Sequence, residues 1–424
     1  MALPRGYRAS VSDPDLDPDS APGGIPPWLT PGVGGIGLAS LLSDLGHEIP
    51  TALLPSFLVT VLGAPAAALG LIEGLADALS GIAKVVGGAL ADDPGRRRSI
   101  AVGGYTLTAI LSALIGLSTA VWQVAIFRTA AWTARGIRGP ARNALLADAV
   151  DPAAYGRAYG FERAMDNAGA VLGPLLALGL VALIGIRQAI LLSVIPGLLA
   201  AVAIVYAVRH LRRPQERHTA PVRIVVRPLL RGSLGRLLVS ISLFEAGNVA
   251  ATLLILRTTE LLAPSQGMDG ATTTAIALYV AYNVAATLAA VPAGRLADAR
   301  GARLVFAGGV ACFAAAYLAF ALGSGVVILA AAFVAAGVGI GAAETAENAA
   351  IAGRAPTELR GSAFGLLAGI QSAGDFIASA VVGLVWTLVS PTLAFVIAAT
   401  LMVGSLVTMG MDYRRRGAVR QTSA

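Results

Sequence analysis

The sequence predicts an all-α integral membrane protein whose helices form two related bundles of six. Hydrophobic residues make up 56% of the 424-residue chain and charged residues only 13%, whereas soluble domains carry about 25% charged residues. The apolar residues gather into twelve stretches, each about 20 residues or longer. The two halves of the chain also share motifs at a nearly constant spacing.

The twelve apolar stretches are long enough for α-helices to cross the roughly 30 Å hydrocarbon core of a bilayer. They lie at 33–62, 66–90, 99–119, 121–149, 161–184, 188–208, 237–262, 271–293, 303–323, 326–350, 361–388 and 391–411. The polar, Pro-rich and acidic segment 1–30 is predicted to be a disordered cytoplasmic tail. It does not have the pattern of a cleavable signal peptide.

The distribution of arginine predicts the orientation in the membrane. Arginines cluster in the even-numbered connections, including eight in the segment 209–236, whereas the odd-numbered connections are nearly free of charge. The positive-inside rule therefore places both termini in the cytoplasm and the chain in the cytoplasmic (inner) membrane. The predicted order is a tail (1–30), a six-helix bundle (31–208), a basic cytoplasmic linker (209–236), a second bundle (237–411) and a basic cytoplasmic tail (412–424). Arginines that cluster in connections between helices do not indicate a nucleic-acid partner.

Four matches indicate that the halves are copies of one unit. The sequence Gly-x-Leu-Ala-Asp begins at Gly88 and again at Gly294, 206 residues later. GRAYG at 156 matches GSAFG at 361, and Asn143-Ala144 matches Asn348-Ala349, both with a spacing of 205. Gly169 and Gly374 have the same spacing. A duplicated six-helix unit is typical of secondary transporters, whose site lies between the halves near the membrane midplane.

The connection between the second and third helices carries a longer motif. It has the pattern Gly-x-x-x-Asp-x-x-Gly-Arg-Arg, formed by Gly88, Asp92, Gly95, Arg96 and Arg97. A weaker copy in the second half contains Gly294, Asp298, Gly301 and Arg303. From about residue 33 to 411, the chain therefore resembles the major facilitator superfamily (MFS), in which this motif occupies the same loop.

The resemblance implies the MFS fold, transport by alternating access, and a gating role for these residues on the cytoplasmic side. We expect Asp92 to lie at a helix N-terminus and Arg96 to pair across the interface between the halves. Asp298 belongs to the same gating set. The alternative is that the arginines only anchor the chain by the positive-inside rule.

Charge inside the spans follows a rhythm of three helices. The first, fourth, seventh and tenth helices carry charged residues, and the third, sixth, ninth and twelfth carry none. Charges within a membrane almost always face a bundle interior or a watery cavity. The first group is therefore predicted to line a central cavity and the second to face lipid, which is also the arrangement that the resemblance implies.

The charged groups on the first two helices are candidates for proton coupling. Asp44, His47 and Glu48 share one helix face at i, i+3 and i+4, and Glu73 and Asp77 form a second stripe. Such groups can change protonation near neutral pH, so we expect the first three to line the cavity with the arginines of helix 4. The alternative is a structural lattice of salt bridges. Position 51 is not a histidine and only one cysteine is present, so we expect neither a metal nor a cofactor.

Candidate substrate contacts lie on the helices predicted to line the cavity. They are Arg128, Trp132, Arg135 and Arg138 in the first half, and Glu245, Asn248, Tyr279, Asn283, Glu344 and Asn348 in the second. Arg135 and Arg138 could hold a carboxylate or phosphate through paired hydrogen bonds. Alternatively, Glu344 and Glu347 neutralise these arginines across the cavity. Arg142 and Glu347 occupy equivalent positions in the repeat, which predicts a gate between the halves.

Two features resemble the proton-coupled antiporter branch of the superfamily. Arg128 lies at that branch's helix-4 arginine, and Gly169, Gly173 and Pro174 match part of its helix-5 motif. The sequence departs from these motifs at Ala131, Trp132, Ala177 and Leu178. The expected function is proton-coupled export (antiport) of a small molecule by a monomer in the bilayer. The alternatives are an importer of an organic anion and, more remotely, a membrane-embedded enzyme or sensor, although no catalytic constellation is present.

Overall fold

The structure is a computed structural model that describes residues 28–211, 224 and 226–422. All regular secondary structure in these residues is helical. The predicted N-terminal tail and most of the predicted basic linker lie outside the described residues.

The first six crossings form the N-terminal bundle, and the sixth is divided into two helices at Ser193. The helices are α1 (Pro31–Ser56), which continues into the π-turn η1 (Phe57–Val61), α2 (Ala66–Leu90), α3 (Pro94–Leu114), α4 (Val121–Ala149), α5 (Tyr155–Ile184), α6 (Ile186–Leu192) and α7 (Val194–His210). Local sequence explains several boundaries. Thr30 caps α1, Asp93 caps α3, and a proline follows each cap at the first helical position.

The C-terminal bundle supplies the other six crossings. Its helices are α8 (Gly232–Gly247), α9 (Ala251–Arg300), α10 (Ala302–Leu322), α11 (Val326–Arg354), α12 (Arg360–Leu388) and α13 (Pro391–Thr422). The predicted seventh helix is broken at 248–250. Its second part and the eighth helix together form α9, which turns at Gly267 with φ 71°. The helix α13 also continues well beyond residue 411, into the predicted basic tail.

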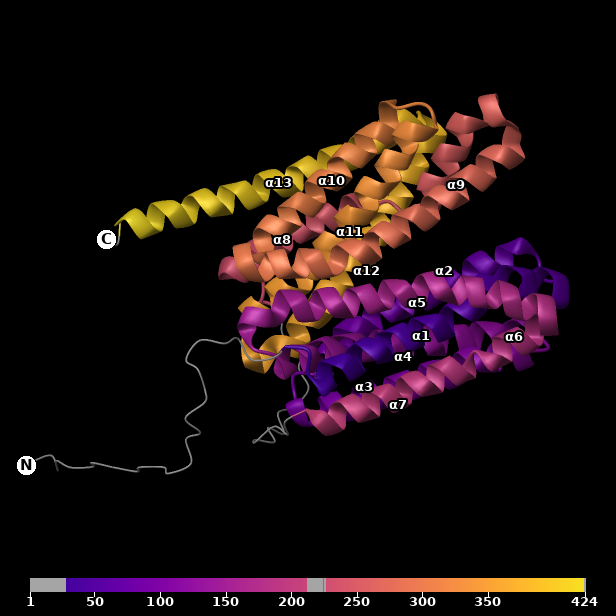
Figure 1. Cartoon of the computed structure of the whole chain (residues 1–424), viewed down its shortest axis with the longest axis horizontal. Helices are drawn as coiled ribbons and strands as arrows, with labels where there is room; N and C mark the ends of the chain where they lie inside the picture. The colour runs from indigo at the N-terminus through magenta and orange to yellow at the C-terminus, as the bar shows by residue number, and fades with distance from the viewer. Residues whose placement is uncertain (1–27, 212–223, 225, 423–424) are drawn as a thin grey trace, which may run out of the picture.

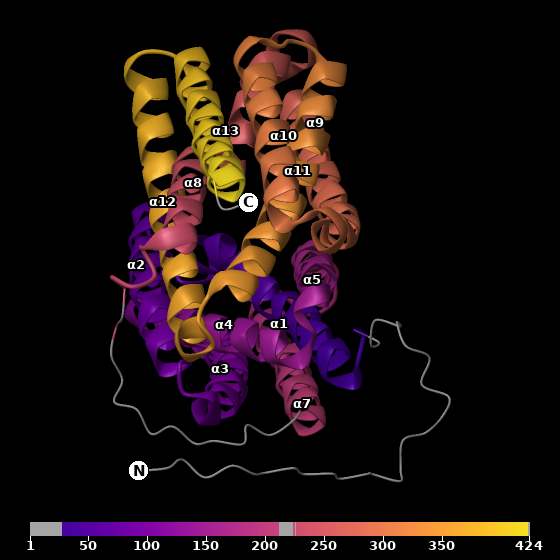
Figure 2. The same cartoon turned by 90° about the vertical axis from the view of Figure 1, so that its left-hand side faces the viewer.

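The two bundles lie side by side with their helices along a common direction (Figure 1). They meet mainly through α2 against α12 and α5 against α9, and the turned view shows both pairs (Figure 2). In the part of the chain that the structure describes, eight helices are long and apolar enough to cross a membrane by length and composition. Large side chains such as Leu71, Leu183 and Val327 are exposed on the outer faces, as expected where lipid replaces water.

Candidate transport site

A cavity of about 1110 Å³ lies between the two bundles. This volume is slightly above the usual range for small-molecule sites, roughly 300–1000 Å³. Residues of α2, α4, α5, α8, α9, α11 and α12 line it. None of its lining residues comes from α3, α6, α7, α10 or α13, which agrees with the predicted rhythm. The prediction that helix 1 lines the cavity is wrong, because α1 contributes no lining residue.

The arginines of α4 form one stripe, and three of them are paired with carboxylates of their own bundle. Arg128 lies 3.0 Å from Glu73, Arg135 lies 3.2 Å from Asp44, and Arg142 lies 2.8 Å from Glu162. The spacing along α4 places these guanidinium groups on one face, and carboxylates of α1, α2 and α5 complete the pairs. Most of the stripe is therefore neutralised within the N-terminal bundle.

Asp44, His47 and Glu48 lie one layer behind the cavity wall. The ring of Trp132 packs edge-on against that of His47, with 5.4 Å between centroids, and Arg135 reaches from the wall to Asp44. His47 donates through Nδ1 to the carbonyl of Ser43 at 3.0 Å, since a carbonyl oxygen can only accept. Its Nε2 lies 3.2 Å from Glu48. The two α4 side chains thus separate this cluster from the cavity that it was expected to line.

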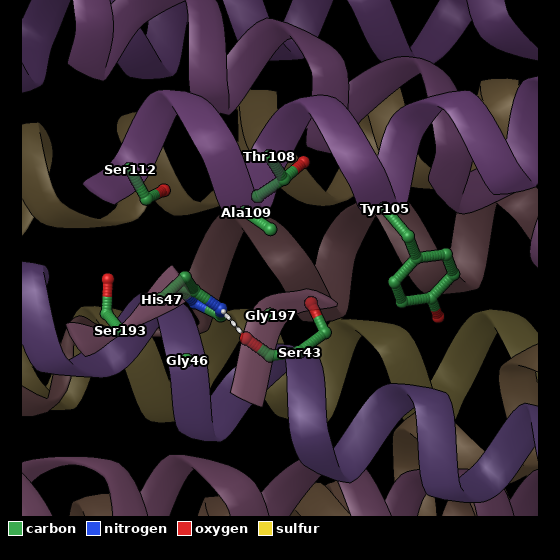
Figure 3. A pocket seen from close by; sticks show the side chains of 9 residues that line it. All are labelled: Ser43, Gly46, His47, Tyr105, Thr108, Ala109, Ser112, Ser193 and Gly197. Carbon is green, nitrogen blue, oxygen red and sulfur yellow. Dashed lines mark hydrogen bonds between the residues drawn. The ribbon is translucent and has the colours of Figure 1, made fainter. Parts of the chain in front are cut away.

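A second, closed pocket lies on the other side of His47, between α1, α3 and the junction of α6 and α7 (Figure 3). It has a volume of about 10 Å³, which is at the lower limit for a site that holds one water molecule. Among the described residues, the buried hydroxyls of Tyr105, Ser112 and Ser193 find no hydrogen-bond partner. His47 is therefore buried between this pocket and the α4 side chains Trp132 and Arg135, which separate it from the cavity.

The remaining predicted site residues divide between the wall and the layer behind it. Asp77 lines the cavity and accepts a hydrogen bond from Trp132 Nε1 at 3.1 Å, whereas Glu73 lies behind it with Arg128. The cavity-lining candidates are Trp132, Arg135, Arg138, Glu245, Asn248, Glu344 and Asn348. Arg128, Tyr279 and Asn283 do not line it. Tyr282 lies on the wall where Tyr279 was expected, one helical turn further along α9.

The wall contributed by the C-terminal bundle is acidic. Glu245, Glu344 and Asp375 all line the cavity. Asp375 was missed in the sequence, although a lone carboxylate in the apolar stretch 361–388 is the signal that identifies functional charge within a membrane. Lys84 lines the opposite wall and donates to Ser372 Oγ at 2.6 Å.

The break in the seventh crossing opens directly onto this acidic wall. Glu245 lies near the end of α8, and residues 248–251 line the cavity with no helical backbone at 248–250. The break leaves backbone N–H groups without helical acceptors. One of them, the Val249 N–H, donates to the hydroxyl of Tyr317 at 2.9 Å. Interrupted helices at the centre of transporters commonly hold substrates or ions. The pair Gly247-Asn248 within 237–262 was the sequence signal for this break, because glycine and asparagine commonly end helices.

Links between the halves differ from the predicted gate. Arg163 pairs with Glu344 at 3.1 Å, and Asn143 donates to its repeat equivalent Asn348 at 3.1 Å. Arg142 is instead held by acidic groups of its own bundle, and Glu347 accepts from Gln371 at 3.0 Å. The predicted Arg142–Glu347 contact is therefore absent from the described residues.

At the end of the molecule that carries the arginine-rich connections, the two bundles are in direct contact. Gly88 packs against Gly361 and Gly365, and a Cβ at Gly88 would lie 2.6 Å from the Gly361 carbonyl. The related crossing places Gly156 against the carbonyl of Gly294. Glycine is needed here because only a bare backbone permits so close an approach. The four positions Gly88, Gly294, Gly156 and Gly361 are those paired by the sequence repeat.

Two aspartates close this end by capping helices of the opposite bundle. Asp92 accepts from Ser362 N at 2.7 Å and from its hydroxyl, at the start of α12. Asp298 accepts from Gly156 N at 2.6 Å and from Arg157, at the start of α5. A carboxylate at a helix N-terminus is favoured by the free N–H groups and the helix dipole. The predicted position of Asp92 is confirmed.

The prediction that Arg96 pairs across the interface between the halves is wrong. Arg96 forms a local pair with Asp93 at 3.1 Å and does not cross the interface. The neighbouring Arg97 is almost fully buried and binds Asp148, which also binds Arg360 of the other bundle at 2.8 Å. One helical position decides this outcome, because it turns Arg97 inward and Arg96 toward the surface.

The closed contacts at Asp92 should respond to pH. Burial raises the pKa of Asp92, although hydrogen bonds from Ser362 oppose the change. A pKa above the value of the exposed carboxyl means that protons favour the closed contact. The contact should be strongest below the pKa of the exposed group and weaken as pH rises through the raised value. Fluorescence or spin-label distances across this end should show closure on acidification, and Asp92→Asn should remove the dependence.

Sequence comparison supports one family for this architecture. The profile of the Major Facilitator Superfamily matches residues 36–280 and 237–423. The chain belongs to the Major Facilitator Superfamily. An uncharacterized MFS-type transporter of Methanocaldococcus jannaschii is 27% identical over 371 residues, which cover 87% of this chain and 91% of the relative. An uncharacterized protein of Mycobacterium tuberculosis is 31% identical over 188 residues, 44% of this chain and 46% of that protein.

Solved MFS structures share the fold. The human organic anion transporter MFSD10 (TETRAN) superposes with a TM-score of 0.72 at 16% identity, covering 91% of this chain and 100% of that one. A bacterial homologue of the iron transporter ferroportin in an outward-facing state also gives 0.72 at 16% identity, with 89% and 98% covered. This MFS protein is thus a multi-pass membrane transporter of small molecules and not an enzyme.

Proposed function

We propose that this MFS transporter is a proton-coupled antiporter that exports a small molecule with a cationic group. The observation that supports the proposal is the state of Glu245 and Asp375. Both line the cavity, and neither has a salt-bridge partner among the described residues. Such a carboxylate binds either a proton or a cationic group. Competition between the two at one position is the basis of antiport.

The orientation follows from the arginines. The positive-inside rule assigns the arginine-rich end, with both termini, to the cytoplasm. Because the bundles are in contact at that end, the cavity would open toward the outside of the cell. The likeness to a ferroportin homologue described as outward-facing supports this assignment. In this state protons from outside would displace the substrate from the carboxylates.

The cluster of Asp44, His47 and Glu48 would provide a second protonatable group. Arg135 connects it to the cavity, since 31% of the Arg135 side chain is exposed while its guanidinium binds Asp44. A proton on Asp44 would release Arg135 from this pair. The uncompensated Arg135 would then repel a cationic substrate, so protonation here also opposes substrate binding.

Reconstituted liposomes containing the full-length protein and a pH-sensitive dye test the proposal. A panel of amines that includes both amphiphilic cations and zwitterionic amino compounds should contain members that release protons across the membrane in the wild type. Glu245→Gln should abolish this coupled proton flux, and Asp44→Asn or Glu48→Gln should weaken it severalfold. The exposed variant Glu260→Gln is the control. Amine-driven proton flux that is equal in the wild type and Glu245→Gln would contradict the proposal.

An organic-anion carrier is the second candidate. Arg138 favours it, because this cavity-lining arginine has no carboxylate partner among the described residues. Uptake of organic anions that does not require Glu245 would support it over the antiporter.

A further inference from the structure

Charge on the cavity wall is sorted by bundle. Each basic side chain that lines the described cavity belongs to the N-terminal bundle: Lys84, Arg135, Arg138, Arg142 and Arg163. The charged lining residues of the C-terminal bundle are all carboxylates, namely Glu245, Glu344 and Asp375. The N-terminal side also carries Asp77 and Asp166, so five basic groups outnumber two acidic ones there, and a ligand between the bundles meets a mainly basic wall opposite an acidic one.

Most of these charges already have partners. Arg135 pairs with Asp44, Arg142 with Glu162 and Asp166, and Arg163 with Asp166 and Glu344. Lys84 and Asp375 face one another closely enough to interact electrostatically. Among the lining charges that are buried, Arg138 and Glu245 are the two without a salt-bridge partner in the described part of the chain, whereas Asp77 and Asp375 are exposed on the wall.

Arg138 is buried and only partly satisfied. Its Nη2 donates to Ser43 Oγ at 2.7 Å, and its guanidinium lies 3.8 Å from the centre of the Tyr105 ring. Its Nη1 has no hydrogen-bond partner among the described residues. A guanidinium group that is 2% exposed and lacks a counter-ion is costly. Ser43 and Tyr105 line the small pocket rather than the cavity, so the guanidinium would turn from them for its free N–H to bind an anionic oxygen in the cavity.

Glu245 is a buried carboxylate without a cationic partner in the described part of the chain. It is 2% exposed, and the side-chain partner that the structure gives it is Asn248, at 3.3 Å. Glu347 lies near enough for the two carboxyl groups to interact, and its own Oε1 has no partner in the described part of the chain. Glu245 also sits at the break of the seventh crossing, where irregular backbone lines the cavity. These features favour a bound cationic group.

We propose that the substrate is a zwitterion whose anionic group binds Arg138 and whose cationic group binds Glu245. A zwitterion neutralises both unpaired groups at once. A simple cation would leave Arg138 without an anionic counter-ion. A simple anion would leave Glu245 without a cationic one. The proposal rests on the proposed function, in which Glu245 takes the cationic group, and adds the second pole of the ligand.

Binding to the purified full-length protein, without a membrane gradient, tests the substrate class. Amino acids, dipeptides and amino-sulfonates are each measured by thermal shift and calorimetry in four matched forms. These forms are the free zwitterion, the N-acetylated anion, the amidated cation and the doubly blocked neutral compound. We expect binding by zwitterionic forms, weakened at least tenfold by either block and by either Arg138→Gln or Glu245→Gln.

Conservative variants and surface variants separate binding from folding. Arg138→Lys and Glu245→Asp keep the charges and should retain more affinity than the neutral variants. Arg231→Gln and Glu260→Gln remove exposed charges away from the cavity and should bind as the wild type does. Binding confined to cations and unchanged in Arg138→Gln would overturn the zwitterion while leaving the antiporter intact. Binding of anions alone would also overturn the zwitterion, and so would a failure of every zwitterion in the panel to bind. Zwitterion binding without coupled proton flux would instead contradict only the proposed function.

Discussion

Gly156→Val should prevent the bundles from closing at their arginine-rich end and should abolish transport. The Cβ of any side chain at Gly156 would overlap the Gly294 carbonyl, and the backbone there cannot retreat without separating α5 from α9. Overpacking of a tight contact costs about 1–3 kcal/mol. A cost of this size changes the ratio of closed to open molecules by roughly one to two orders of magnitude.

Spin labels at Ser99 and Thr357, in a Cys312→Ala background, report the separation directly because they lie on opposite bundles at this end. The distance distribution should move to longer values in Gly156→Val. Gly103→Val is the control, because no atom lies within 4 Å of a Cβ built there. Unchanged distances together with normal transport would show that the crossing is not a gate. Gly361→Val should reproduce the effect at the repeat-related crossing.

Arg142→Met should be among the most destabilising single substitutions in the N-terminal bundle. The Arg142 guanidinium neutralises Glu162 at 2.8 Å and contacts Asp166 at 3.4 Å. The Glu162 side chain is 2% exposed and keeps only the Ser40 hydroxyl as a hydrogen-bond donor after the change. Removing one partner of a buried ion pair costs about 3–5 kcal/mol, because the other charge is left uncompensated.

Chemical denaturation in detergent measures the free energy of unfolding for this comparison. The double variant Arg142→Met/Glu162→Gln should recover much of the loss, since neither side chain then carries a buried charge. Arg231→Gln, an exposed arginine, is the matched control. Equal stability of the single and double variants would show that Glu162 does not depend on Arg142.

Much of the gate could be predicted because its residues recur in the repeat. A motif around Asp92 and an echo around Asp298 indicated two equivalent contacts, and the structure places both aspartates at helix N-termini of the opposite bundle. Choosing between Arg96 and Arg97 was beyond the motif. Adjacent helical residues point about 100° apart, so their partners depend on how α3 is rotated in the bundle.

The cavity was less predictable than the gate. Counting charge per helix identified α4, α8 and α11 as wall helices, but it also assigned α1, whose acidic residues lie behind Arg135 and Trp132. A charged residue buried behind a wall and one on its surface give the same sequence pattern. Only the packing of α4 against α1 separates them.

The amino-acid sequence by itself determined the membrane environment, the twelve crossings and the repeat. Composition, apolar length and internal spacing are properties of the chain alone, and they suffice for this level of description. The tertiary structure decided which charges pair and which remain open. Salt bridges such as Arg163–Glu344 join residues far apart in the chain, and their formation depends on the relative position of two bundles. Arg138 and Glu245 stand out only after all these pairs are assigned, because an unpaired charge is defined by its surroundings and not by its own residue type.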